Sequence, residues 1–165
     1  MIALKILKQK NFMSKLLTTD LFDDFTVEEI TIDTFNTFTI DGRIHKEFFK
    51  DTDAPEEVPQ SEFSEWARIR PIAFSLIKGK HTPLGFKFIL HLSDKEKLSV
   101  LQASDMDISP DQVSLGIGIK YSQGEVLITT GVSYRIFTLD KSAEKAWDEY
   151  IPSFLESNGI EADLL

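Results

Sequence analysis

Hydrophobic residues recur with a helical period near the end of the chain. Between residues 141 and 157 they fall three or four positions apart, so they share one face of an α-helix. Asp140 precedes this stretch and is a favourable N-cap residue, and Gly159 follows it. Pro152 predicts a bend, because proline removes one backbone hydrogen bond. The pattern therefore predicts a C-terminal helix over 141–157.

Three shorter segments carry the same period. The apolar residues between Phe12 and Leu17 share one helical face, with lysines opposite. A second helix is expected over 71–78, because Pro71 suits a first helical turn. A third, over 94–103, begins with a capping-box pattern at Ser93.

Elsewhere the hydrophobic period is two, which is typical of strands. Asp41-Gly42 and Gln123-Gly124 are each predicted to form a hairpin turn between such segments. The expected strands are 2–6, two or three segments within 26–49, then 85–92, 113–121, 125–132 and 134–139. Together these patterns predict an α+β fold, with an antiparallel sheet and about four helices.

The order of elements suggests an internal duplication. Residues 2–49 and 86–139 would each form a strand, a helix and antiparallel strands, joined by an acidic connection (50–65) and a basic helix and loop (66–85). A strand–helix–three-strand unit occurring twice is similar to one domain of the DNA sliding-clamp fold. That resemblance implies inner helices with Lys or Arg directed toward DNA. A clamp encircles DNA with several such domains, and one chain of this length does not.

Composition narrows the class of protein. A chain of 165 residues with 42% hydrophobic residues and 13 Phe is expected to be a single globular domain. It has no Cys, which excludes disulfides, thiolate nucleophiles and Cys-ligated metal centres. No signal-peptide core or membrane span is predicted, so we expect a cytoplasmic protein without a membrane partner. No motif calls for a cofactor, and the oligomeric state stays open.

One basic stretch stands out from an acidic chain. The whole sequence carries a net charge of −9, yet the window from Trp66 to Ser93 has five Lys or Arg and no Asp or Glu. Two structural explanations exist: the lysines cap the end of helix 71–78, or segment 51–65 packs alongside and neutralises them. The functional explanation is a surface that docks an anionic partner, either nucleic acid or an acidic protein. Its candidate binding residues are Arg68, Arg70, Lys78, Lys80, His81 and Lys87, with Trp66 as an aromatic anchor.

We therefore predict a non-catalytic binding module whose contact surface is 66–87. An alternative is an enzyme that uses Asp41 and His45, four residues apart on one strand, as an acid–base pair or with a metal ion. No motif of a serine hydrolase, nucleotide-binding protein or EF-hand supports the enzyme. A further alternative is an oligomeric structural protein.

Three blocks of sequence carry a family resemblance: "TFNTFTIDGRIHKEFF", "RPIAFSLIKGKHTPLGF" and "FTLDKSAEKAWDEY". They resemble a family from anaerobic gut-type bacteria that is known only as a domain of unknown function. The resemblance spans essentially the whole chain. It implies a bacterial cytoplasmic protein and no particular chemistry.

Overall fold

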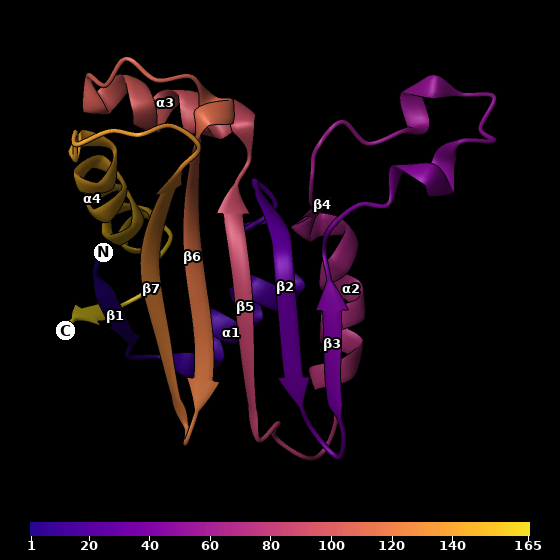
Figure 1. Ribbon diagram of the computed structural model, residues 1–165. Coiled ribbons are helices and arrows are strands. Elements are labelled where there is room, and N and C mark those ends of the chain that lie inside the picture. The colour runs from indigo at the N-terminus through magenta and orange to yellow at the C-terminus, as the bar shows by residue number, and fades with distance from the viewer.

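One antiparallel sheet organises the molecule (Figure 1). The computed structural model describes residues 1–165. The strands are β1 (Ala3–Ile6), β2 (Phe25–Asp33), β3 (Thr37–Asp41), β4 (Ser64–Glu65), β5 (Gly85–Leu92), β6 (Val113–Ser122), β7 (Glu125–Tyr134) and β8 (Ala162–Leu164). Their order across the sheet is β3-β2-β5-β6-β7-β1-β8, and β4 pairs with β2 beyond the end of β3. Every pairing is antiparallel.

Helices cover one face of the sheet and leave the other face open. They are α1 (Gln9–Thr18), α2 (Trp66–Ile77), α3 (Asp94–Ser104) and α4 (Ser142–Ser157). In the view of Figure 1, α1 and α2 lie behind the sheet, and α3 lies across its upper end next to α4. Three short 3₁₀ turns complete the fold: η1 (Lys46–Phe49), η2 (Pro55–Glu57) and η3 (Pro110–Gln112). The α+β class and the four helices are thus confirmed.

The core lies between the sheet and these helices. Alternate strand residues such as Ile30 and Phe88, which are partners across β2 and β5, face the helices and are buried. The indole of Trp66 on α2 packs on Phe88, and the indole of Trp147 on α4 packs on Phe25. Because only one face is packed in this way, the strands alternate apolar and polar positions, as in other one-sided antiparallel sheets.

The predicted C-terminal helix is confirmed, with one adjustment at its start. The helix begins at Ser142 and its N-cap residue is Lys141, so the prediction of Asp140 as N-cap is wrong; Asp140 accepts a hydrogen bond from the Ser142 backbone N–H at 2.9 Å just before the helix. The helix continues through Pro152 to Ser157. The helices expected near residues 12–17 and over 94–103 are also present.

Helix α2 begins earlier than predicted. Its first residue is Trp66, so Pro71 lies in the second turn and not in the first. Proline at this position removes a hydrogen bond to the carbonyl four residues before it. The buried Trp66 side chain stabilises the added first turn by packing, and this outweighs the hydrogen bond that Pro71 removes.

The hairpin turn predicted at Asp41-Gly42 is wrong. Strands β2 and β3 are joined instead at residues 34–36, and Asp41 ends β3. Gly42 lies against β2, where a Cβ atom would be 1.8 Å from the carbonyl oxygen of Val27. The glycine is therefore required for close approach of two backbones. The turn predicted at Gln123-Gly124 is confirmed, and both residues have positive φ.

Two expected strands are absent. Residues 43–49 form a single bridge and the turn η1, and β7 ends at Tyr134, so residues 135–139 are a loop. The two halves also differ in arrangement, because α1 lies on the sheet face whereas α3 lies across its end (Figure 1). The duplication itself stays a prediction.

A long excursion leaves the sheet between β3 and β4. We call residues 44–62 the arm; its two ends meet at the antiparallel bridge between Arg43 and Phe63. The arm projects from the upper right of the molecule in Figure 1, and none of its residues is buried.

Candidate basic site

The two arginines of the basic stretch lie on the helix-covered side of the molecule. Arg68 and Arg70 both belong to α2. Arg70 forms an ion pair with Asp23 and donates to the carbonyl of Thr19. Burial raises the pKa of the Asp23 carboxyl, against the opposing effect of the Arg70 guanidinium. Arg70 therefore fixes α2 to the segment after α1, and only Arg68 remains exposed without an ion pair.

Trp66 does not act as a surface anchor. Its side chain is 0% exposed, and the indole N–H donates to the carbonyl of Leu16 at 3.2 Å. The residue joins α2 to α1 inside the core. The aromatic contact predicted at this position is therefore wrong.

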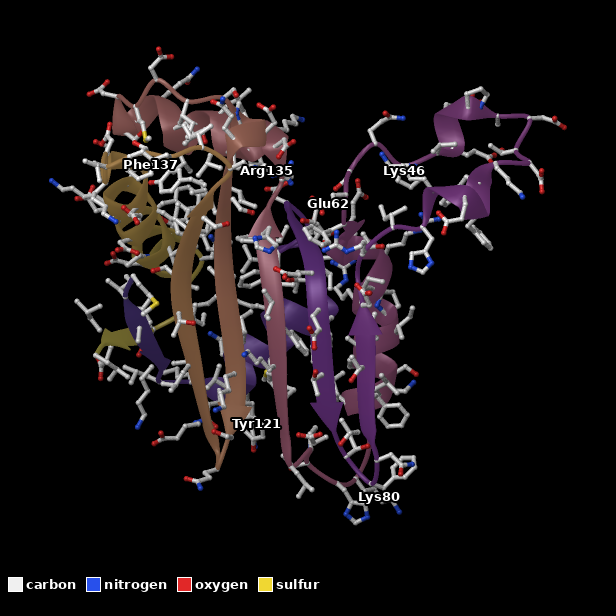
Figure 2. All side chains as sticks on the ribbon, in the orientation of Figure 1. Lys46, Glu62, Lys80, Tyr121, Arg135 and Phe137 are labelled. Carbon is white, nitrogen blue, oxygen red and sulfur yellow. The ribbon has the colours of Figure 1, made fainter.

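Lys78, Lys80 and His81 lie in the exposed loop after α2, at the lower end of the sheet (Figure 2). The end of α2 is closed by the backbone N–H of Lys78, which donates to the carbonyl of Phe74 at 2.8 Å. The Lys78 ammonium lies 5.8 Å from the centre of the Phe74 ring. No lysine side chain caps the helix carbonyls, so C-capping does not account for this cluster.

The explanation that the acidic segment 51–65 neutralises these lysines is also wrong. That segment belongs mainly to the arm, which projects from the end of the molecule opposite to Lys80 (Figure 2). None of the ion pairs includes Lys78, Lys80 or Lys87. These cations therefore remain free within the chain.

Lys87 lies on the open face, where the sheet places it beside a lysine that the sequence pattern did not single out. Lys87 on β5 is the direct partner of Lys120 on β6. Both side chains are exposed, and neither forms an ion pair or a side-chain hydrogen bond. Like charges directly opposite each other across two strands destabilise a sheet. The register of β5 and β6 thus creates a doubly cationic spot.

The two lysines line a shallow hollow of about 500 Å³ at the lower end of the open face. We call it the basic hollow. Phe35 and Leu84, which are 87% and 77% exposed, form its apolar rim. Asp33 is its only acidic residue, and its carboxylate accepts a hydrogen bond from the Thr37 hydroxyl at 2.7 Å. The hollow therefore combines positive charge with exposed apolar surface.

Asp41 and His45 do not form a pair. Asp41 accepts a hydrogen bond from the backbone N–H of Arg43 at 3.0 Å, which is a local turn contact. His45 is exposed in the arm and forms no side-chain hydrogen bond or ion pair. The two residues are not on one strand, because β3 ends at Asp41. The hypothesis of an enzyme that uses Asp41 and His45 as a pair is therefore rejected.

A hydrogen-bonded imidazole does exist, on the open face near the base of the arm. His91 Nε2 contacts a carboxylate oxygen of Glu28, and His91 Nδ1 lies 3.1 Å from the hydroxyl of Ser114. The Phe63 ring stacks on the imidazole, with centroids 5.6 Å apart. The two hydrogen bonds hold the imidazole in the orientation that Phe63 covers, so we assign this cluster to fixing the arm.

Two arginines reinforce the same base. Glu62 accepts hydrogen bonds from Arg43 at 2.8 Å and from Arg135 at 2.9 Å (Figure 2). The Arg43 guanidinium also lies 5.3 Å from the centre of the Phe63 ring. His91 of β5 thus holds Phe63, next to the arm, and Arg135 in the loop after β7 holds Glu62, the last residue of the arm.

Metal ligands are not gathered anywhere in the fold, since no group of three or more His, Asp or Glu side chains is placed to hold an ion. None of the four helices is long and apolar enough to cross a bilayer.

Comparison with known proteins gives a family but no function. A family model, described as a family of unknown function (DUF5721), matches residues 15–163. The chain belongs to DUF5721. No curated protein and no solved structure matches the chain. The predicted membership in a family of unknown function is therefore confirmed for this DUF5721 protein. No similarity to sliding clamps is found.

Proposed function

We propose that this protein is a non-catalytic binding module whose basic hollow docks an anionic partner. The proposal rests on Lys87 and Lys120, which lie opposite each other on β5 and β6, are both exposed and form no ion pair. An anionic group seated between the two ammonium groups would remove their repulsion and gain two favourable contacts. Binding at this spot is therefore favoured by the same charge arrangement that costs the free protein stability.

The rim of the hollow indicates more about the partner. Phe35 and Leu84 expose most of their surface beside the lysines. Apolar side chains that lose this exposure on docking gain about 25 cal/mol for each Å² buried. A partner that offers an acidic group next to an apolar side chain would use both features.

An acidic protein segment fits the hollow better than a nucleic acid does. The chain carries a net charge of −9, so the surface beyond the hollow repels a long polyanion. A short acidic segment contacts only the hollow, so it avoids most of this repulsion. The proposal therefore narrows and shifts the predicted contact surface 66–87: Lys87 is the candidate binding residue that lines the hollow, and Lys120 is added to it.

The test is titration of a fluorescent acidic peptide containing one Phe, followed by anisotropy. We expect affinity that falls as salt rises toward about 0.15 M, where screening acts over roughly 8 Å. Replacement of both hollow lysines, K87E/K120E, is expected to weaken binding at least roughly tenfold, or about 1.4 kcal/mol.

The matched control is K10E/K95E, which makes the same charge change at two exposed lysines outside the hollow. It should change affinity by no more than about twofold. Equal weakening by the two variants, or no binding at low salt, refutes the proposal. A single-stranded oligonucleotide that binds at the hollow more tightly than the peptide would assign the site to nucleic acid instead.

A further inference from the structure

The base of the arm is held by several contacts, although the arm has no buried residue of its own. Beside the Arg43–Phe63 bridge, the backbone N–H of Ile44 donates to the carbonyl of Glu62 at 3.0 Å. The stacking of Phe63 on His91 and the two arginines on Glu62 complete this base. These contacts order the base of the arm before docking, which lowers the entropy that binding costs there.

The chemistry of the arm is the complement of the basic hollow. Residues 44–62 contain six acidic residues and two lysines, for a net charge of −4. Phe48 in η1 is 83% exposed and contacts only the edge of Phe49 among the aromatic rings. The arm thus offers carboxylates beside an exposed aromatic ring, which is the combination that the hollow lysines and their apolar rim would recognise.

We infer that the partner of the basic hollow is the arm of a second copy of this chain. This inference rests on the proposed function, because it names the anionic partner of the same site. The hollow is shallow, with a volume of about 500 Å³, and its lysines and apolar rim are the features that would contact an acidic arm with an exposed aromatic ring.

The positions of arm and hollow determine the kind of assembly. In Figure 2 the arm, marked by Lys46, leaves the upper end of the molecule, and Lys80 and the hollow lie at the lower end. The arm of one copy therefore points away from its own hollow and toward the lower end of a following copy. Such a head-to-tail contact uses two different surfaces, so it builds a ring if the rotation closes and a filament if it does not.

The experiment is a mixing test with two complementary variants. In the arm variant, D53K/E56K reverses two exposed charges; in the hollow variant, K87E/K120E does the same. The unmodified chain is expected to gain mass with concentration in sedimentation velocity at about 0.1 M salt, where repulsion between the net charges of two copies is screened beyond about 10 Å, and to lose this mass as salt rises further. Each variant alone should sediment as an 18.8 kDa monomer.

Mixed one to one, the two variants retain one intact arm and one intact hollow between them. The reversed arm and the reversed hollow are also complementary in charge, so the mixture should recover assembly that neither variant forms alone. A chain with all four substitutions has complementary charges again and should recover at least part of the assembly. E149K/E156K, which changes two exposed acids on α4, is the matched control and should assemble as the unmodified chain does.

The outcomes separate this inference from the proposed function. A chain that stays monomeric at about 0.1 M salt, or variants that assemble alone, or a mixture that stays monomeric, overturns the self-docking inference. If the same monomeric chain still binds the acidic peptide and K87E/K120E weakens that binding, the proposed function stands. Thermal unfolding of every variant shows that the substitutions leave the fold intact.

Discussion

Lys97 on α3 is a buried cation whose removal gives the clearest measure of how the upper end of the molecule is held. Its side chain is 6% exposed, and the ammonium donates to the carbonyls of Pro110 and Val113, each at 2.8 Å. Asp94, which is largely exposed, lies 2.7 Å away. Lys97 therefore joins α3 to the segment that leads into β6.

The prediction concerns Lys97→Met, which keeps the length of the side chain and removes the donors. Hydrogen bonds from a charged group contribute about 1.5–3 kcal/mol each, and the methionine recovers part of this through apolar packing. We expect a net loss of about 3 kcal/mol from the free energy of unfolding. With a urea m-value of about 2 kcal/mol/M, the midpoint should fall by about 1.5 M.

Urea unfolding followed by tryptophan fluorescence measures this shift. Lys95→Met is the matched control, because Lys95 is exposed on the same helix and should change stability by less than about 0.5 kcal/mol. Asp94→Asn should also have a small effect, since an exposed ion-pair partner contributes only ~0–1 kcal/mol. A Lys97→Met midpoint equal to that of the Lys95 control would show that the two carbonyls do not depend on the ammonium.

Three further predictions concern other parts of the fold. Gly42→Ala should lower the free energy of unfolding by about 3 kcal/mol, or Tm by roughly 6–12 °C, because the added methyl group meets the backbone of β2. Gly131→Ala is the control, because its Cβ would meet open space, and it should leave Tm nearly unchanged. Hydrogen bonds from Ser142 lower the pKa of the Asp140 carboxyl, so its NMR titration midpoint should lie below 3.8, and Ser142→Ala should raise it. Because the folded-state pKa is depressed, this contribution to stability is present above the ordinary pKa and is lost as pH falls through the folded value; an unshifted midpoint would contradict it. His91→Ala should make the arm open more often and be cut roughly tenfold faster by a protease at low concentration, and an unchanged rate would show that the imidazole does not fix the arm.

The sequence pattern predicted the elements whose period is long and complete. The stripe of α4 extends over four turns, and the face between Phe12 and Leu17 is equally regular, so both helices were found. The pattern was less informative where a single residue decides the backbone. Asp41-Gly42 has the composition of a hairpin turn, but its glycine is needed because two backbones approach closely.

The candidate site shows the same limit at a larger scale. Charge along the chain drew attention to the window that contains Lys80 and Lys87, and it grouped residues that the fold places on opposite faces. Lys120 is distant in sequence and belongs to no basic stretch. Only the register of β5 with β6 places it beside Lys87. Long-range strand pairing of this kind is not encoded in a local pattern, so the hollow could not be predicted from the sequence.

The position of β1 has a consequence for how the chain folds during its synthesis. This strand lies between β7 and β8, and Lys5 pairs with Leu127 on one side and with Asp163 on the other. Both neighbours are translated more than a hundred residues later, which takes on the order of ten seconds at about 5–20 residues per second. The hairpin of β2 and β3 can close while the ribosome is still working, but β1 must wait. Its apolar residues Leu4 and Ile6 are therefore exposed to chaperones throughout elongation, and contact order makes docking of β1 a late folding step.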